Sequence, residues 1–409
     1  MNPGGDLEIP LNTSQTEALR LRIFETVIHS CPAHFFIAFA ANGADAPAWI
    51  TAWKAAAGRG LDRENARQAA IFEAVERAST MTGGPDDPRA RDSRTPPEGA
   101  IPAESLWQYS ADQLLKLYAN KNFSSLHGCG KPVDNLWMEG IHLTRGTRHP
   151  LPATAVLLDE DARLGLGSPF TSSTGTAARD DLDAATRHAL MERVERDAVA
   201  IWWYNRLLAP RIAPEAAREA LPDALASWLA DRRRVTWHLL LPHDLPAATV
   251  VALSARTDGT RPAIGAAAAL DPARAVLAAT LEMLQGEIAL AQMRAAAPAP
   301  EQANPLLAWS ETTDALALHD LRGDGEAPLP ATRRHDDLLD ALDAAGIDVY
   351  VADLTRPELG VPVARAVSPH LRDWLPRFAP GRLADVPVAL GLRRSPATEK
   401  DFNPVPFVI

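Results

Sequence analysis

Six oxygen-bearing side chains recur as three pairs with one spacing in this chain of 409 residues. The two members of each pair lie three positions apart, which makes them neighbours on a helix surface. Carboxylate and amide oxygens are hard ligands that suit Mg²⁺, and this ion usually completes its shell with water and substrate phosphate. The three pairs therefore predict a shared magnesium site, formed by Glu73 and Glu76, Glu192 and Glu195, and Glu282 and Gln285.

An arginine directly follows two of these pairs, Arg77 after Glu76 and Arg196 after Glu195. A guanidinium group binds phosphate through two parallel hydrogen bonds, so these residues predict phosphate oxygens beside the magnesium site. One such pair of acids alone is usual on a solvated helix. The interpretation therefore depends on the threefold repetition.

The acid pairs end a longer template in which an aspartate is followed by alanines four and eight positions later and by glutamate eleven positions later. On a helix these positions fall on one stripe, where small alanines allow close packing. The acids then face the packed side, where charge needs a cation or hydrogen bonds. Each aspartate suits a helix N-cap, so we expect helices over 62–79, 181–208 and 271–295. The template residues are Asp62, Ala66, Ala70 and Glu73; Asp181, Ala185, Ala189 and Glu192; and Asp271, Ala275, Ala279 and Glu282.

The remaining elements must position these helices. Stretches rich in proline, glycine and charge predict loops over 83–104, 296–305 and 322–332. A helical period predicts one further helix over 334–344. The alternation of helices and strands favours an α+β fold with mixed sheets, and the pairing of the strands stays open. Short apolar or β-branched runs predict strands over 34–41, 154–159, 235–241, 249–255, 347–353 and 361–367.

Composition restricts the function classes further. The chain is 46% hydrophobic and 23% charged, which is typical of a folded globular protein, and its net charge of -11 disfavours a general nucleic-acid binder. Its apolar runs are shorter than the roughly 20 residues that cross a bilayer, and the first residues lack a secretory signal pattern. Two cysteines, Cys31 and Cys129, are too few for a disulfide framework. We expect a cytoplasmic protein that binds neither nucleic acid nor membranes.

These motifs resemble the YcaO family, ATP-dependent enzymes that activate backbone amides of peptides. TSSTGTAARDDLDAATRHALMERVERDAVAIWW (171–203) is similar to the central motif of that family, a Ser-Asn-Gly loop followed by a helix ending in E-x-x-E-R-D-A. The earlier loop and helix of the family resemble AGRGLDRENARQAAIFEAVERAS (57–79). LEMLQ (281–285) resembles the E-x-x-Q helix, and DLTRPELGVPVARA (353–366) resembles a late strand. The motifs occur in family order.

The resemblance implies a YcaO-like fold in which the six paired residues surround Mg²⁺ and the phosphates of ATP, with Gln285 near both. Arg196 would then contact phosphate and act in catalysis. The positions that depart from the family pattern are Ala69 for serine, Arg59 for lysine, Thr174 for asparagine, and Arg179 with Asp180 for Gly-Asn. The departures put the base and ribose contacts in question and leave the metal site intact. The implied nucleotide-binding residues are Arg59, Arg77, Thr174, Asp180, Arg196 and Gln285.

The last residues, DFNPVPFVI (401–409), resemble the proline-rich tail of azoline-forming members, with Pro404 and Pro406 matching. That likeness makes the terminal carboxylate of Ile409 the candidate general base. We expect an N-terminal region over 1–55, a catalytic ATP-binding domain over 56–400 and a tail over 401–409. A tail that frays into solvent is the alternative.

The implied activity is ATP-dependent formation of thiazolines or oxazolines from Cys, Ser or Thr of a ribosomal precursor peptide, as in bacteriocin biosynthesis. The implied partners are that peptide, an E1-like protein that binds its leader, and an FMN-dependent dehydrogenase that oxidises the rings. Two alternatives stay open at this point. A thioamide-forming member would use external sulfide, and a non-catalytic member would only scaffold a complex.

Overall fold

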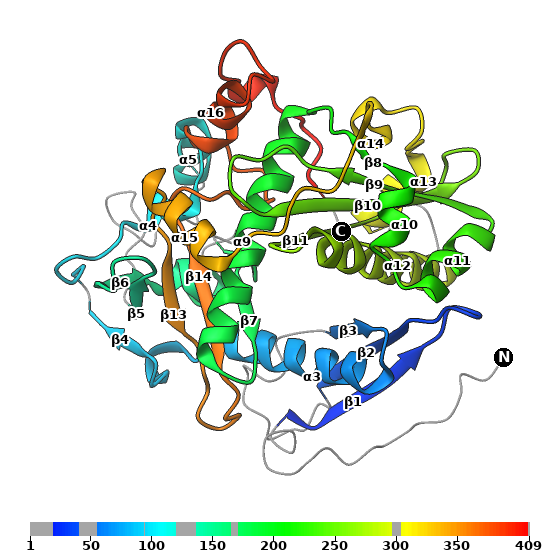
Figure 1. Cartoon of the computed structure of the whole chain (residues 1–409). Helices are drawn as coiled ribbons and strands as arrows, with labels where there is room; N and C mark the ends of the chain where they lie inside the picture. Colours follow the sequence, from blue (N-terminus) through cyan, green and yellow to red (C-terminus); the bar gives the residue numbers. More distant parts are fainter. Residues whose placement is uncertain are drawn as a thin grey trace.

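The computed structural model describes residues 19–40, 55–93, 95–119, 136–164, 171–296 and 304–407. Three β-sheets surround three helices that come from the three copies of the sequence template (Figure 1). These helices are α3 (Arg63–Thr80), α9 (Leu182–Asn205) and α12 (Pro272–Ala296). The mixture of helices with largely antiparallel sheets confirms the expected α+β class.

The helices begin where the sequence predicts. Asp62 and Asp181 are the N-caps of α3 and α9, and their side chains accept hydrogen bonds from the backbone N–H groups of Asn65 and Ala184. Asp271 accepts from the N–H of Ala273 at 3.0 Å, directly at the start of α12. Such bonds satisfy N–H groups that lack a partner in the first turn.

The first sheet has the order β1-β2-β3 and is antiparallel. Helix α3 packs against β2 and β3, and alanines from its template stripe are fully buried there. Figure 1 shows this helix lying along the sheet in the blue part of the chain. The strands are β1 (Leu21–Thr26), β2 (His34–Ala40) and β3 (Ala56–Gly60).

The second sheet has the order β11-β10-β9-β8-β12, in which only β8 and β12 pair in parallel. Helix α12 covers β10 and β11, so the third template stripe faces this sheet. The strands are β8 (Arg211–Ile212), β9 (Arg234–Leu240), β10 (Ala248–Arg256), β11 (Ala263–Ala269) and β12 (Glu326–Ala327).

The third sheet has the order β4-β5-β13-β14-β7, and β6 pairs with β5. Helix α9 packs against β7 and β14 of this sheet and also against β11 of the second sheet. It therefore links the two sheets, as its central course in Figure 1 shows. The strands are β4 (Ala90–Asp92), β5 (Leu136–His142), β6 (Arg148–Pro152), β7 (Thr176–Ala178), β13 (Tyr350–Asp353) and β14 (Val363–Val367).

Shorter helices lie around this frame. Among the described residues, no helix is both long and apolar enough to cross a bilayer. These helices are α4 (Ala103–Trp107), α5 (Ala111–Tyr118), α7 (Ala153–Val156), α8 (Glu160–Arg163), α10 (Pro214–Glu219), α11 (Asp223–Asp231), α13 (Pro305–Thr312), α14 (His319–Arg322), α15 (His335–Ala344) and α16 (Arg382–Ala389), with 3-10 turns at Gly84–Asp86 and Glu399–Asp401.

The structure confirms five of the six predicted strands and corrects the sixth. The run 154–159 lies within α7, an isolated bridge at Leu158 and the start of α8 rather than in a strand. Its period is ambiguous because a short, wholly buried apolar run fits either element. The predicted loop 83–104 holds β4 and the start of α4, and the predicted loop 322–332 holds β12. Cys129 and most of the predicted loop 296–305 lie outside the described residues.

Candidate functional site

Two of the template helices approach a strand so closely that only glycine fits between them, and the third lies beside a glycine in the loop before β7. A Cβ atom at Gly58 of β3 would lie 2.1 Å from the carbonyl oxygen of Ala66 in α3. At Gly265 of β11 it would lie 2.2 Å from the amide nitrogen of Met283 in α12. At Gly175, before β7, it would lie 2.6 Å from the Arg193 side chain of α9. The alanine stripes and these glycines together set the helix positions.

The first glutamate of every pair uses this approach in the same way, because it accepts a hydrogen bond from the backbone of the neighbouring strand or loop. The N–H of Ala57 donates to Glu73 at 3.2 Å, and that of Gly175 donates to Glu192 at 3.2 Å. The N–H of Ala266 donates to Glu282 at 2.9 Å. The three-part sequence repeat is therefore also a repeat of side-chain geometry.

The second members of the pairs have different surroundings. Glu195 accepts from the N–H of Ala268 in β11 at 3.3 Å, so α9 and the second sheet meet at the site. The Arg59 guanidinium donates to Gln285 at 3.1 Å and lies 3.5 Å from Glu282. Arg59 of β3 thus joins the first sheet to α12. The structure brings α3, α9 and α12 together around one group of acids.

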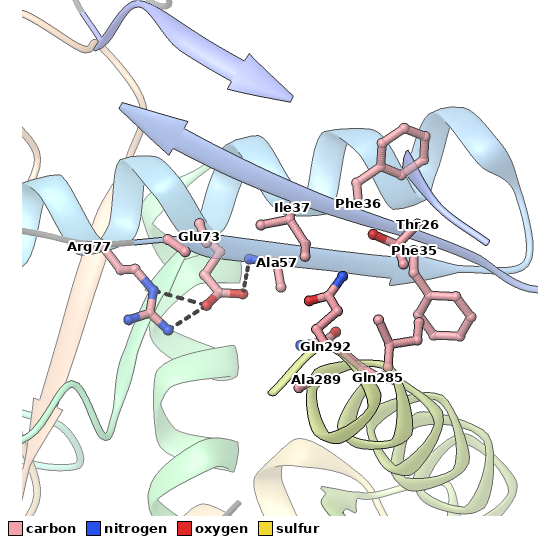
Figure 2. Close-up of a pocket in the computed structure, with 13 residues that line it drawn as sticks. Thr26, Phe35, Phe36, Ile37, Ala57, Glu73, Arg77, Gln285, Ala289 and Gln292 are labelled. Atoms are coloured by element: carbon pink, nitrogen blue, oxygen red, sulfur yellow. Dashed lines mark hydrogen bonds and ion pairs between the residues drawn. The ribbon is translucent and has the colours of Figure 1, made fainter. Parts of the chain in front are cut away.

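The two arginines that directly follow an acid pair in the sequence also form ion pairs with these acids. Arg77 donates from Nε and Nη2 to one carboxylate oxygen of Glu73, at 3.0 and 2.7 Å (Figure 2). Arg196 lies between two carboxylates, with Nη2 3.1 Å from Glu192 and Nη1 3.2 Å from Glu195. Arginine is always charged at neutral pH, so these contacts offset part of the negative charge.

The acids repel one another where water is largely excluded. Burial raises the pKa of Glu195 to about 8, and the carboxylates of Glu282 and Glu192 add to that effect while Arg196 opposes it. Burial, with the charges of Glu192 and Glu73, also holds the pKa of Glu76 well above its usual range. A divalent cation would relieve this repulsion. The oxygen-only donor set therefore fits Mg²⁺, and the adjoining guanidinium groups fit phosphate.

A second cluster of possible metal ligands lies outside the six paired residues. That cluster is Asp197, His243 and Asp244, whose ligand atoms lie within 4.8 Å of one another. Arg382 already occupies it, donating to Asp197 at 2.6 Å and to Asp244 at 2.7 Å. Despite its burial, Asp197 has a pKa held well below its usual range by Arg382 and His243, whereas the pKa values of Glu195 and Glu76 are raised. The negative charge of this cluster is therefore already compensated, and we assign it a structural role.

Of the other predicted residues, Thr174 directly precedes Gly175, whose N–H donates to Glu192, whereas Asp180 lies away from the acids at the start of α9. Thr174 is only 2% exposed, and its N–H donates to the hydroxyl of Ser172. Asp180 is exposed and precedes the N-cap of α9, Asp181, which is eleven residues before Glu192 and therefore about 17 Å from it along the helix axis. Ile409 lies outside the described residues.

Sequence analysis misses Arg365, a site residue on β14. It is 2% exposed, and the charges of Glu192 and Glu76 are close enough to raise its pKa, although burial lowers that pKa overall to about 10. Its guanidinium donates to the hydroxyls of Thr171 and Thr176 at 2.7 and 2.8 Å. An arginine within the apolar run Val-Ala-Arg-Ala-Val is the signal that could have identified it.

A cavity of about 190 Å³ opens beside these acids between the first sheet and α12. Figure 2 shows Glu73 and Arg77 at one end, Phe35 at the other, and Gln285 and Gln292 facing the sheet from α12. Small-molecule sites commonly combine apolar walls with a few polar groups. This cavity suits an apolar ring that is joined to a charged group. Its lining also includes Thr26, Phe36, Ile37, Ala55, Ala56, Ala57, Ile288 and Ala289.

Residues 57–372 match the sequence model of one protein family, described as a YcaO cyclodehydratase that binds ATP and Mg²⁺. An uncharacterized protein of Methanothermobacter thermautotrophicus is 28% identical over 350 residues, which cover 77% of this chain and 81% of that protein.

Solved structures resemble the whole chain. A heterocyclase in complex with substrate and cofactor gives a TM-score of 0.76 at 26% identity and covers 97% of this chain. The heterocyclase TruD gives 0.68 at 28% identity and covers 86%. This chain spans only 57% and 52% of the lengths of those two proteins. A structure of YcaO from Methanopyrus kandleri, bound with AMPPCP and Mg²⁺, shares the fold with a TM-score of 0.61 at 22% identity, covering 88% of each chain.

Proposed function

This chain belongs to the YcaO family, and we propose that it is a cytoplasmic ATP-dependent cyclodehydratase acting on a ribosomal precursor peptide. The family binds ATP and Mg²⁺. The observation that carries the proposal is the meeting of three template helices, whose first glutamates are each aligned by a backbone N–H beside a glycine. Such alignment is costly unless the acids share a cation.

In the proposed reaction, the side-chain sulfur or oxygen of a Cys, Ser or Thr gives up its proton to a base and forms a bond to the preceding backbone carbonyl carbon, and the π bond of that C=O group opens onto the oxygen. Bound Mg·ATP supplies the phosphoryl group that converts the former carbonyl oxygen into a leaving group. Departure of phosphate and loss of the amide proton leave a C=N bond within a thiazoline or oxazoline ring. The balance is peptide plus ATP giving ring-bearing peptide, ADP and phosphate.

We assign the roles of this chain's residues from their surroundings. The proposed metal ligands are the six paired residues. Glu192 and Glu195 lie at their centre, because Glu192 is close enough to Glu76 of α3, and Glu195 to Glu282 of α12, for their charges to interact. Arg196 would stabilise negative charge on the transferred phosphoryl group, which is the main demand of phosphoryl transfer. Arg59 and Arg77 would hold the remaining phosphates, and the cavity beside Glu73 and Arg77 would take the base. The roles of Thr174 and Asp180 in nucleotide binding, and of the Ile409 carboxylate as general base, stay predictions.

The proposed partners follow from the resemblance to peptide-modifying enzymes. This chain would receive the precursor peptide from an E1-like leader-binding protein, and an FMN-dependent dehydrogenase would oxidise the rings. The YcaO-like motifs extend from about residue 57 to the tail, so we propose a single catalytic domain over 56–400, preceded by the region 1–55 and followed by the tail 401–409.

The test is ring formation on a peptide whose backbone carbonyl before a cysteine carries a heavy oxygen isotope. The chain is incubated with Mg·ATP, that peptide and a leader-binding protein from the same genome, and mass spectrometry follows peptide and phosphate. We expect loss of one water per ring and appearance of the heavy oxygen in inorganic phosphate. Gain of sulfur from added sulfide without ring closure would instead establish thioamidation, and binding of Mg·ATP without turnover would establish a scaffold.

A further inference from the structure

Arg196 is held on its edge by two carboxylates and on its face by an indole ring. Its Cζ atom lies 3.3 Å from the centroid of the Trp374 ring, while Glu192 and Glu195 accept the contacts described above. Its buried Nε and Nη1 atoms have no hydrogen-bond acceptor among the described residues, so the contact of Nη1 with Glu195 is an ion pair only. Because two nitrogen atoms on the guanidinium edge make no hydrogen bond, the stacked ring is the contact that fixes the plane of the guanidinium.

Trp374 is itself fixed by its neighbours in the segment after β14. The Tyr204 hydroxyl of α9 donates to the Trp374 carbonyl oxygen at 2.5 Å. The adjacent Asp373 accepts from the hydroxyl of Ser172 and lies 3.8 Å from Arg193 of α9. The indole therefore belongs to a rigid connection between the loop before β7 and the helix that carries the central acid pair.

The tail docks onto the same indole. Phe407 lies 5.7 Å from the ring of Trp374 and 5.1 Å from that of Trp203, measured between ring centroids. The indole N–H of Trp203 donates to the carbonyl oxygen of Val405 at 2.7 Å. Phe402 and Phe407 are each 7% exposed, so the described part of the tail is packed and not frayed.

We propose that Trp374 is a positioning residue that aligns Arg196 and transmits the docking of tail residues 402–407 to it. The path runs from Phe407 through the indole to the guanidinium, with one ring contact at each step. A displaced tail would free the indole, and Arg196 would then lose its fixed plane toward the central acids. This proposal depends on the proposed function for one point only, that Arg196 binds phosphate.

The test compares the affinity of substituted proteins for Mg·ATP by calorimetry, with circular dichroism to verify folding. We expect Trp374→Ala to weaken binding about tenfold, since a desolvated cation–π contact is lost. Trp374→Phe should stay within about threefold of the wild type, because a ring face remains. The matched control is Trp228→Ala, which removes an indole of α11 whose ring centroid lies 5.2 Å from the Arg232 guanidinium, and it should leave the affinity for Mg·ATP unchanged.

Transmission from the tail is tested by Phe407→Ala alone and in the Trp374→Ala background. We expect about threefold weaker binding from the single substitution and no added loss in the double one, because contacts along one path are not additive. Losses that simply add, or a phenylalanine at position 374 that fails to restore affinity, would overturn the proposal.

A readout independent of nucleotide separates this proposal from the proposed function. Stacking on an indole shifts the side-chain Nε–H resonance of Arg196 upfield, and Arg196→Lys assigns that signal. We expect the signal to move toward its ordinary position in both Trp374→Ala and Phe407→Ala. An unmoved signal would refute the coupling even if Mg·ATP binds, whereas absent Mg·ATP binding with a moved signal would refute only the proposed function.

Discussion

At the residue scale, the site depends on charges that oppose each other at short range. Arg196 contacts Glu192 and Glu195, Arg77 contacts Glu73, and each contact replaces solvation that burial removes. Sequence analysis predicted phosphate as the partner of these arginines, whereas in the structure each also reaches the glutamate four positions before it on the same helix. Spacing could not predict the contact of Arg196 with Trp374, which lies far along the chain.

Replacing Arg77 tests one of these charges. Arg77→Ala should weaken binding of Mg·ATP at least about tenfold, because hydrogen bonds to a charged partner contribute about 1.5 to 3 kcal/mol. The free energy of unfolding should change by less than about 1 kcal/mol, as for other partly exposed pairs. Calorimetric titration measures the first effect and urea unfolding the second.

Its matched control is Arg63→Ala, because Arg63 of the same helix also pairs with a glutamate and is similarly exposed, at 45% of its side chain against 38% for Arg77. Equal affinities of the two variants for Mg·ATP would contradict the phosphate-binding role of Arg77.

Gly175 allows a second test at this scale. Its φ of 79° lies in the left-handed region, and an added Cβ would lie 2.4 Å from the carbonyl oxygen of Ala366. Gly175→Ala should therefore lower the free energy of unfolding by on the order of 3 kcal/mol, combining backbone strain with a steric clash. Urea unfolding measures this loss.

Gly346→Ala is the comparison, since Gly346 has a φ of 62° and open space where a Cβ would lie. It should cost only about 1 kcal/mol from backbone strain. Similar losses at both positions would show that the close approach at Gly175 does not constrain the fold.

At the element scale, one unit of helix and strand is used three times. The helices of these units, α3, α9 and α12, were predictable from sequence because their alanine stripes and N-cap aspartates are local signals. The partner strands were not, because β3, β7 and β11 are rich in alanine or glycine and contain only two of the β-branched residues that indicate a strand, Thr176 and Ile264. The glycines 15 to 17 positions before each first glutamate were the available signal.

His238 in β9 reports on the packing of α12 against the second sheet. It is 5% exposed, lies 2.8 Å from the hydroxyl of Thr280, and burial lowers its pKa from 6.5 to about 4. Between these pH values the unfolded chain binds a proton that the folded chain does not, so stability falls as pH falls. His238→Gln should remove about 2 to 3 kcal/mol of the stability loss between pH 7 and 4.5.

Urea unfolding of both proteins at the two pH values checks this expectation. The same pH dependence in wild type and His238→Gln would show that the helix and sheet do not exclude water from this side chain.

At the scale of the whole molecule, three sheets each contribute one helix to one group of acids. Family order of the motifs predicted this assembly from sequence, but the pairing of strands and the role of α9 in joining two sheets required the structure. Tail residues up to Phe407 pack beside the Trp374 indole that stacks on Arg196. The sequence of the proline-containing tail alone did not predict whether it packs on the molecule or frays into solvent.

A ligand shared by three units should rigidify them together. We expect Mg·ATP to slow amide hydrogen exchange simultaneously at the β3–α3, β7–α9 and β11–α12 junctions, because binding stabilises only the assembled form. The β5–β6 hairpin lies outside the site and serves as internal control. Slowing confined to one junction would mean that the three helices do not share the ligand.

The central claim is that the paired acids form one Mg²⁺-dependent nucleotide site. The most direct measurement is calorimetric titration of Mg·ATP into the wild type and into Glu192→Gln, Glu195→Gln, with and without Mg²⁺. The control is Glu139→Gln, because Glu139 forms an exposed ion pair with Arg148 outside the proposed site. We predict Mg²⁺-dependent binding in the wild type and control and its loss in the folded double variant. Unchanged binding in that variant, or no binding in any folded protein, would contradict the claim.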